Sequence, residues 1–320
     1  MPCASLGAMY IGIDVGGTKS SVILGLASGE ILERESFSTP NPAEAREAFI
    51  EIGKQFLGRR PGQVLEAIGC SVPGPMSSRL GKLCNPPNLP AWKDAPIRQW
   101  MQTAFGVPVA VENDANAAAL AEWRWGHKQK INNLVYFTCG TGMGAGLVLN
   151  GALYRGMQDL AGEVGHVRLR PFGPVGFYKA GSLEGFTSGS NLPKLAIIRL
   201  AEPHQASVLD SVPVEALTSK VIGEAALQGD AMARSIIEES AGYLGEFIGA
   251  LIDILNPEHI SLGSHALRLG ELYLKPVRQS AQREALPEAF AACRIEAAAL
   301  GESVQDLASL AAALEVGKKV

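Results

Sequence analysis

The stretch Val111-Glu112-Asn113-Asp114-Ala115-Asn116-Ala117-Ala118-Ala119-Leu120-Ala121-Glu122 joins a short apolar run to a run of alanines. The preceding apolar residues, 107–111, predict a buried strand, and the alanines predict a helix because alanine has the highest helix propensity. Asn113 and Asp114 therefore lie at a strand-to-helix junction. Taken alone, this position favours capping, since Asn and Asp accept hydrogen bonds from the free N–H groups of a first helical turn. The alternative is that Asp114 faces a cleft and removes a proton from a substrate hydroxyl.

The composition indicates a cytoplasmic protein with a large hydrophobic core. The chain has 320 residues, 47% of them hydrophobic, and a net charge of −4, so nucleic acid is not an expected partner. Its length suggests about two domains. No apolar run approaches the roughly 18 residues of a membrane-spanning helix, and a signal peptide is not expected. The five cysteines have no paired spacing, which favours a reducing compartment over a disulfide framework; they are Cys3, Cys70, Cys84, Cys139 and Cys293.

A glycine-containing turn follows the first predicted strand. The apolar segment 9–13 runs into Asp14-Val15-Gly16-Gly17-Thr18-Lys19, and segments 20–26 and 31–37 then predict two more strands of an antiparallel meander. The glycines permit close backbone approach, and successive N–H groups there can bind an anion. Asp14 can hold a hydrated Mg²⁺, which prefers carboxylate, water and phosphate oxygens. An ordinary hairpin turn is the alternative, but the ordered motif is more specific than Gly-Gly alone.

A proline-rich loop, residues 85–92, follows a predicted helix at 44–57 and a predicted strand at 64–72. Its three prolines exclude the interior of a helix or strand. The loop is either a rigid surface connection or the wall of a sugar site. In the second case Asn85 or Asn88 offers amide contacts and Trp92 closes the site.

A second glycine-rich segment, Gly140-Thr141-Gly142-Met143-Gly144-Ala145-Gly146, lies between predicted strands at 134–138 and 147–149. No helix follows it, so it is not the GxGxxG dinucleotide fingerprint. Asn150-Gly151 then predicts a two-residue hairpin. Alternating glycines also occur at bulges and packing sites. Two strand–loop–strand units in one chain nevertheless favour two halves that bind one polyphosphate.

Three ionisable residues follow in predicted loops and a helix start. Glu163 and His166 are flanked by glycines, which leaves their side chains free for a polar ligand, although a lone His is usually structural. Glu184, taken alone, would be a solvated helix residue. Further on, segment 230–255 predicts a long helix with an apolar stripe.

The C-terminal part predicts two more strands and a closing helix. Segment 259–262 predicts a strand and leads into a turn at Gly263-Ser264, and segment 295–299 predicts the last strand. Segment 303–314 predicts a helix that can pack on the N-terminal domain.

These motifs, in this order, resemble the ROK family (repressors, open reading frames and kinases) of the hexokinase and actin-like superfold, over about residues 9–315. The resemblance implies an actin-like ATPase (ribonuclease H-like) fold of two α/β domains around a deep cleft. The implied N-terminal domain is 1–112, with a C-terminal helix at about 304–320 packed on it, and the implied larger domain is 113–303. The resemblance also implies a homodimer that binds a sugar, ATP and Mg²⁺.

The resemblance assigns roles by position. Asp114 corresponds to the base that activates the 6-hydroxyl of a hexose, and Asp14 to the residue near Mg²⁺. The expected sugar-binding residues, with the loop residue Asn88 included, are Asn88, Asn113, Glu163, His166 and Glu184. The expected nucleotide-binding residues are Asp14, Gly16, Gly17, Thr18, Lys19, Gly140, Thr141, Gly142, Gly144 and, in the adenosine motif, Gly263.

The sequence departs from the family at its usual zinc site. The family's three cysteine positions fall here on Val175, Phe177 and Ser182, and no cysteine lies between Cys139 and Cys293. Valine and phenylalanine supply no thiolate, so we expect no zinc and expect His166 to be free of that role. Apolar packing must then hold the loop, and the candidates for it are Phe172, Phe177, Tyr178 and Phe186. A milder departure is Ser264, where the adenosine motif has a second glycine.

The favoured hypothesis is an ATP-dependent kinase that phosphorylates the 6-hydroxyl of a hexose, with glucose as the first candidate. N-acetylglucosamine, N-acetylmannosamine, fructose and mannose remain alternatives, as does polyphosphate as the donor. A second hypothesis is a sugar-sensing repressor, which is disfavoured because the eight residues before Met9 are too few for a helix-turn-helix domain. A third is another ATPase of the superfold, which would share the phosphate loops but lack the Glu-Asn-Asp-Ala-Asn and Gly-Glu-x-Gly-His motifs.

Overall fold

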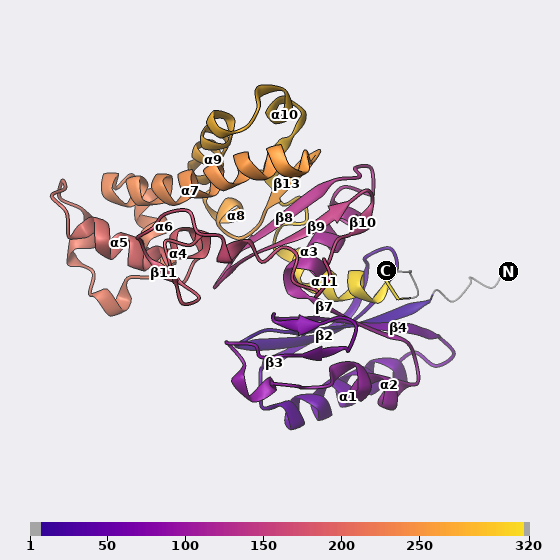
Figure 1. Cartoon of the computed structure of the whole chain (residues 1–320). Helices are drawn as coiled ribbons and strands as arrows, with labels where there is room; N and C mark the ends of the chain where they lie inside the picture. The colour runs from indigo at the N-terminus through magenta and orange to yellow at the C-terminus, as the bar shows by residue number, and fades with distance from the viewer. Residues whose placement is uncertain (1–7, 317–320) are drawn as a thin grey trace. The chain divides into compact units, whose positions relative to one another are not determined.

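The computed structural model describes residues 8–316 and contains two mixed five-stranded sheets (Figure 1). Contacts divide the chain into two units. The first holds the described residues up to Lys130, Leu153–Ala161 and the residues from Ser303, and the second holds Ile131–Ala152 and Gly162–Glu302.

The sheet of the first unit has the strand order β3-β2-β1-β4-β7. Three strands form the predicted antiparallel meander, and two more extend it in parallel from β1. The strands are β1 (Met9–Val15), β2 (Lys19–Leu26), β3 (Ile31–Ser38), β4 (Leu65–Val72) and β7 (Val109–Asn113), with a small separate hairpin of β5 (Met76–Ser77) and β6 (Lys82–Leu83).

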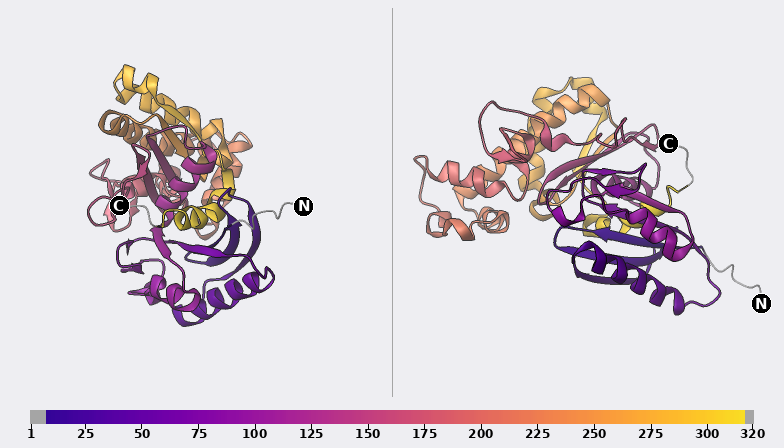
Figure 2. Two further views of the ribbon diagram at one scale, coloured as in Figure 1. Left: turned by 90° about the vertical axis from the view of Figure 1, so that its right-hand side faces the viewer. Right: turned by 60° about the horizontal axis from the view of Figure 1, so that its bottom comes forward.

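Helices cover both faces of this sheet, as Figures 1 and 2 show. One face and its helices α1 (Pro42–Gly58) and α2 (Ile97–Phe105) form a continuous apolar core. The short helix α3 (Asp114–Ala121) continues into a π-helical turn, Glu122–Gly126. The closing helix α11 (Val304–Ala313) packs against β1, β4 and α3, which confirms the predicted helix.

Glycines allow α11 to approach the sheet closely. A Cβ atom at Gly69 on β4 would lie 2.0 Å from the carbonyl oxygen of Ser309, and one at Gly12 on β1 would lie 2.3 Å from the Ser309 hydroxyl oxygen. Real Cβ atoms do not occur at these distances, so any larger residue would push the helix away from the strands.

The sheet of the second unit has the order β10-β9-β8-β13-β14 and repeats the same plan, an antiparallel meander followed by parallel strands. Its strands are β8 (Leu134–Cys139), β9 (Met143–Leu149), β10 (Ala152–Leu153), β13 (His259–Leu262) and β14 (Arg294–Ala297). The predicted Asn150-Gly151 turn joins β9 to β10, and both residues have the positive φ of a tight hairpin.

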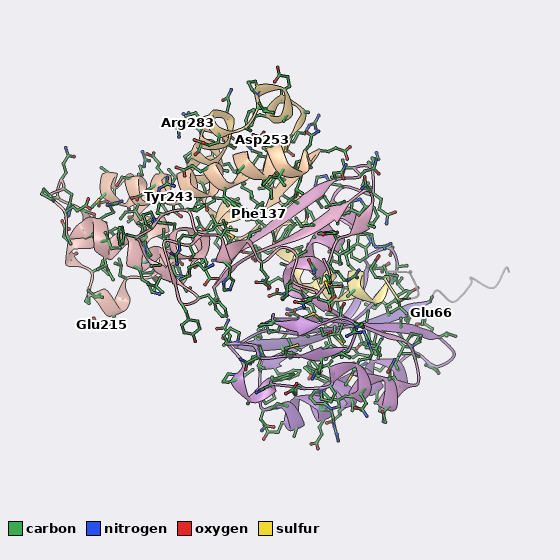
Figure 3. All side chains as sticks on the ribbon, viewed as in Figure 1. Glu66, Phe137, Glu215, Tyr243, Asp253 and Arg283 are labelled. Atoms are coloured by element: carbon green, nitrogen blue, oxygen red, sulfur yellow. The ribbon has the colours of Figure 1, made fainter. Side chains whose placement is uncertain are left out.

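The long helix α7 (Ala231–Leu255) packs against this sheet and against α9. Asp230 caps its start, and Asn256 ends it in the left-handed conformation. Phe137 of β8, which is labelled in Figure 3, packs edge-on against Phe247 of α7, with ring centroids 6.2 Å apart. The other helices are α4 (Leu183–Thr187), α5 (Leu192–Leu200), α6 (Ser219–Leu227), α8 (His265–Leu269), α9 (Glu271–Glu284) and α10 (Pro287–Ala292), and a hairpin pairs β11 (Val175–Gly176) with β12 (Lys179–Ala180).

Two local expectations were wrong. Gly144 and Gly146 do not lie in a loop but within β9, paired with Thr138 and Tyr136, so the loop shrinks to residues 140–142. Trp92 does not close a site either, since it is 1% exposed and packs on Phe49 in the core. Among the described residues, no helix combines the length and apolarity needed to cross a bilayer.

We predict that Gly69→Ala lowers the free energy of unfolding by roughly 1–3 kcal/mol, because the added methyl group overpacks the contact between β4 and α11. Gly58→Ala is the matched control, since a Cβ there meets no atom within 4 Å. Urea unfolding of both variants tests this, and equal midpoints for the two would contradict the close-packing explanation.

Candidate functional site

The junction after β7 shows which residue has the capping role that was considered for both Asn113 and Asp114. Asn113 caps α3, because its Oδ1 accepts hydrogen bonds from the N–H groups of Ala115, at 2.9 Å, and Asn116, at 3.3 Å. Asp114 is the first residue of the helix and is exposed. Its Oδ1 also accepts from the Ala115 N–H. Asn113 is thus the N-cap residue, and Asp114 follows it as an exposed carboxylate in the first turn of the helix.

Asp14 lies at the end of β1, opposite Ser71 in the parallel strand β4. Burial raises the pKa of Asp14 to about 7; the Ser71 hydroxyl, which donates to the carboxylate, lowers it, and the nearby charge of Asp114 raises it further. The first unit thus brings these two carboxyl groups into the same electrostatic environment. Sequence reasoning missed Ser71, although its place at the end of a parallel strand was a usable signal.

The turn after Asp14 is tightly closed. The Gly16 N–H donates to the carbonyl oxygen of Lys19 at 3.0 Å, and a Cβ at Gly16 would lie 2.6 Å from that oxygen. Gly17, Thr18 and Lys19 are exposed. The exposed Asn88 lies against this turn, because a Cβ at Gly17 would come within 3.5 Å of its Cβ. The expected sugar-side loop and phosphate-side turn therefore meet within the first unit.

In the second unit, the turn at Gly140–Gly142 is held by its carbonyl groups. The Gly189 N–H donates to the Gly140 oxygen at 2.7 Å, and the Ser190 hydroxyl donates to the Thr141 oxygen at 2.5 Å. A turn held in this way can direct its N–H groups to an anion. A Cβ at Gly140 would lie 3.9 Å from the Ser264 hydroxyl, so the two expected nucleotide-binding segments are neighbours.

The adenosine-motif position Gly263 has no room for a side chain, since a Cβ there would lie 2.6 Å from the Tyr136 hydroxyl. The next residue, Ser264, has φ 45° and ψ −95°, a conformation that favours glycine. This explains why the resemblance expects glycine at that position.

Glu163, His166 and Glu184 come together in the second unit. Partial burial raises the pKa of Glu163, while the neighbouring His166 lowers it and Glu184 raises it. The Glu184 carboxylate also accepts the N–H of Met143 at 3.1 Å, which ties it to the glycine turn.

Two glycines in this cluster replace side chains that would collide with β9. A Cβ at Gly162 would lie 1.9 Å from the carbonyl oxygen of Ala145, and one at Gly165 would lie 2.4 Å from that of Met143. The backbone that carries Glu163 is therefore pressed directly against the strand.

The loop at the expected zinc position is held by protein contacts. Val175, Phe177 and Ser182 do not fit a zinc site, and the buried Ser182 hydroxyl instead accepts the Gly185 N–H at 3.2 Å. The Phe177 ring packs edge-on against His166, with centroids 4.5 Å apart, and Lys179 donates to the His166 carbonyl at 2.6 Å.

The expected apolar packing is right for only part of the loop. Phe186 is buried and stacks on Tyr243 of α7 with ring centroids 3.9 Å apart, but Phe172 and Tyr178 are 84% and 91% exposed. An ion pair supplements the aromatic contact, since Arg170 donates to both oxygens of Glu246 on α7 at 2.8 and 2.7 Å. The loop thus depends on charge pairing that its aromatic content did not predict.

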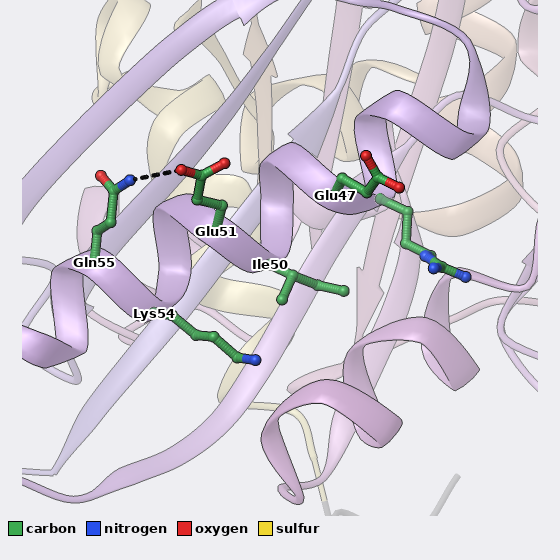
Figure 4. A pocket seen from close by; sticks show the side chains of 6 residues that line it. Glu47, Ile50, Glu51, Lys54 and Gln55 are labelled. Carbon is green, nitrogen blue, oxygen red and sulfur yellow. Dashed lines mark hydrogen bonds between the residues drawn. The ribbon is translucent and has the colours of Figure 1, made fainter.

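A depression on α1 is unrelated to these residues. Figure 4 shows that its lining comes from one helix, where Gln55 donates to Glu51 at 3.2 Å. The lining residues are Arg46, Glu47, Ile50, Glu51, Lys54 and Gln55. None of the expected site residues is among them.

The chain belongs to the ROK family, whose family model matches residues 10–313. It is 32% identical over 306 residues to a glucokinase of Halalkalibacterium halodurans, covering 91% of each chain. It is 30% identical over 309 residues to a xylose repressor of Caldicellulosiruptor bescii, covering 94% of this chain and 77% of the repressor.

The structure resembles that of a ROK family glucokinase from Streptomyces griseus in complex with glucose and AMPPNP. The TM-score is 0.78 with 31% identity, covering 96% of this chain and 100% of that one. This similarity confirms the expected actin-like fold of two α/β domains.

His265, which sequence reasoning missed, yields a prediction about pH. It is 7% exposed, its Nε2 has no hydrogen-bond partner among the described residues, and burial, with a smaller effect of Arg268, lowers its pKa from 6.5 to about 4. Between pH 6.5 and pH 4 the His265 imidazole is protonated in the unfolded chain but remains largely neutral in the folded protein. We therefore expect stability to fall as pH drops from 6.5 towards 4, with a slope from this residue of at most about 1.4 kcal/mol per pH unit.

Comparing the pH dependence of urea unfolding for the wild type and His265→Gln isolates this contribution. The variant should lose less stability over that interval. Parallel profiles would contradict a buried neutral imidazole.

We predict that chelation leaves the fold intact. After treatment with EDTA and return to buffer with Mg²⁺, the melting temperature should be unchanged, because hydrogen bonds and ion pairs hold the loop at 168–182. Elemental analysis of the purified protein checks this, and stoichiometric zinc together with a lower melting temperature after chelation would contradict it.

Proposed function

We propose that the protein is an ATP-dependent sugar kinase that transfers the γ-phosphoryl group to the 6-hydroxyl of glucose. The observation that carries this proposal is the geometry after β7, where the Asn113 side chain caps α3 and the Asp114 carboxylate is exposed at the first position of that helix. The similarity to a glucokinase over 91% of each chain supports glucose as the acceptor.

In this proposal Asp114 accepts the proton of the 6-hydroxyl as the phosphoryl group arrives. Such a base contributes roughly 10²–10⁴-fold to the rate. Asn113 retains its amide N–H donors for a sugar hydroxyl, since capping uses only its oxygen. Glu163 and Glu184 accept hydrogen bonds from other hydroxyls, and His166 and Asn88 complete the set.

In this proposal two backbone turns bind the phosphate groups of ATP. Gly16, Gly17, Thr18 and Lys19 form the first, and Gly140, Thr141 and Gly142 form the second, with Gly263 beside the adenosine. Gly144 lies in β9, which begins directly after the second turn, and it remains a proposed nucleotide-binding position.

Asp14 is the residue proposed to hold Mg²⁺ through water. A carboxylate with a neighbouring hydroxyl and a second carboxylate fits this ion, which takes one or two protein carboxylates together with phosphate oxygens. Bound Mg²⁺ neutralises charge on the phosphate oxygens. The ionised form of Asp14 is the one that binds, and a positive charge there opposes the effect of burial on its pKa.

We also propose that the protein is a cytoplasmic homodimer. The described cysteines are free, which fits a reducing compartment. Light scattering after size-exclusion chromatography tests the dimer, and a monomer at every concentration would refute it.

A sugar sensor without catalysis is the second candidate, because a xylose repressor is 30% identical over 94% of this chain. It predicts sugar binding without phosphoryl transfer. Turnover therefore separates the candidates, and calorimetric binding alone does not.

We expect glucose-dependent conversion of ATP to ADP with formation of one glucose 6-phosphate per ATP, and we expect Asp114→Asn to lower kcat by roughly 10²–10⁴-fold. Glucose binding by calorimetry should be nearly unchanged, since the amide still hydrogen-bonds a hydroxyl. Asp94→Asn is a matched control, because Asp94 forms its ion pair with Lys82 on the surface of the first unit.

The same turnover assay should be run with four other sugars, each with ATP and with polyphosphate as the phosphoryl donor. These sugars are mannose, fructose, N-acetylglucosamine and N-acetylmannosamine. A different sugar that turns over best would correct the acceptor. Absence of turnover throughout, or normal turnover by Asp114→Asn, would refute the proposed function.

A further inference from the structure

The segment 153–161 belongs to the first unit, although the residues before and after it belong to the second. We call it the strap. A turn closes it, because Gly156 has φ 70° and the Ala161 N–H donates to the Arg155 carbonyl at 3.0 Å. One end is anchored by Asp159, which accepts hydrogen bonds from the Ser78 N–H, at 2.9 Å, and the Ser78 hydroxyl, at 2.6 Å.

The other anchor reaches the junction that carries Asp114. Arg155 donates from Nε to Glu112 Oε2 at 2.7 Å, and the two side chains are 15% and 4% exposed. A charge pair with this degree of burial stays fixed only if its remaining polar atoms are also satisfied.

Glu112 satisfies this requirement with two further hydrogen bonds, both to residues at the junction of β7 and α3. Its Oε1 accepts the backbone N–H of Asn113 and the Nδ2 of Asn116, each at 3.1 Å. Asn113 is the cap of α3, and Asn116 is buried in the first turn of that helix. Asp114 lies between these two residues, so the Glu112 carboxylate binds the backbone before it and a buried side chain after it.

The carboxylate performs this task only while it is charged and in place. Burial raises the pKa of Glu112, and the Arg155 guanidinium has the largest opposing effect. Without that guanidinium, a buried carboxylate would retain only neutral N–H donors. It would then either take up a proton or move towards water, and in both cases its hold on Asn113 and Asn116 would weaken.

We propose that Arg155 is a positioning residue for Asp114, which acts through Glu112 and makes no contact with the substrate. The proposal rests on the proposed function in one respect: the positioning affects turnover only if Asp114 is the base. The arrangement of the turn itself is independent of that function.

The experiment compares Arg155→Met and Arg155→Lys with a matched control. Arg124→Met breaks another ion pair of the first unit, between Arg124 and Glu315, with a length of 2.9 Å and side chains 16% and 13% exposed. All three variants should lose thermal stability to some extent. Only Arg155→Met should lower kcat, on the order of tenfold to a hundredfold because misplacement of a catalytic group is that costly, with KM for glucose unchanged.

Arg155→Lys keeps the charge and should recover most of kcat. A kcat for Arg155→Met equal to that of Arg124→Met would overturn the proposal and leave Arg155 with a structural role alone.

Amide hydrogen exchange gives a readout that does not require turnover. We expect faster exchange at residues 113–116 in Arg155→Met than in Arg124→Met. If the wild type phosphorylates no sugar, the proposed function fails, while faster exchange at 113–116 still supports positioning of the turn by Arg155. Unchanged exchange at these residues would overturn the positioning role whatever the activity.

Discussion

The parallel register of β1, β4 and β7 is the constraint on which the arrangement of polar side chains in the first unit depends. It pairs Asp14 with Ser71, and Ser71 with Glu112, so that three polar residues lie in a row at the carboxyl ends of three adjacent strands. A slip of one residue would turn every side chain to the opposite face. The row would then lose both the hydrogen bond from Ser71 to Asp14 and the support that Glu112 gives to the helix start. Packing against α11 maintains this register, because glycines on β1 and β4 match the contour of that helix.

In the second unit, the corresponding constraint is the close approach of backbone to backbone. Gly162 and Gly165 press the segment of Glu163 and His166 against carbonyl oxygens of β9, and Glu184 binds the N–H of Met143 in the same strand. The backbone positions of Glu163 and His166 are therefore set by contact with β9, and the Glu184 side chain is tied to the same strand. The glycine turn at 140–142 begins where β8 ends, so one pair of strands positions both the polar cluster and the turn.

Periodicity and turn chemistry were sufficient to predict the local elements. The meander of the first unit, the Asn150-Gly151 hairpin and the long helix α7 all follow from short-range patterns, in which neighbouring residues determine the conformation. The partnership of Arg155 and Glu112 could not be predicted in this way, because 43 positions separate them and no local pattern links them. Trp92 was misplaced for a related reason. Its proline-rich surroundings indicate a loop, but the ring is long enough to reach the apolar core from that loop.

The loop at the family's zinc position shows how one covalent constraint can be replaced by several weaker ones. Thiolate ligands would fix several backbone positions at once. Here Phe177 and Tyr178 form the tight turn of a two-pair hairpin with positive φ values, 42° and 64°, which are unfavourable for residues with a Cβ. That strain is offset by contacts distributed around the loop, among them Lys179 on the His166 carbonyl and Arg170 on Glu246. Each such contact contributes only about 1–3 kcal/mol or less, so the orientation of His166 depends on all of them together. A loop held by several separate contacts can change by single substitutions without unfolding, so the surroundings of His166 can vary more readily than a site fixed by metal ligands.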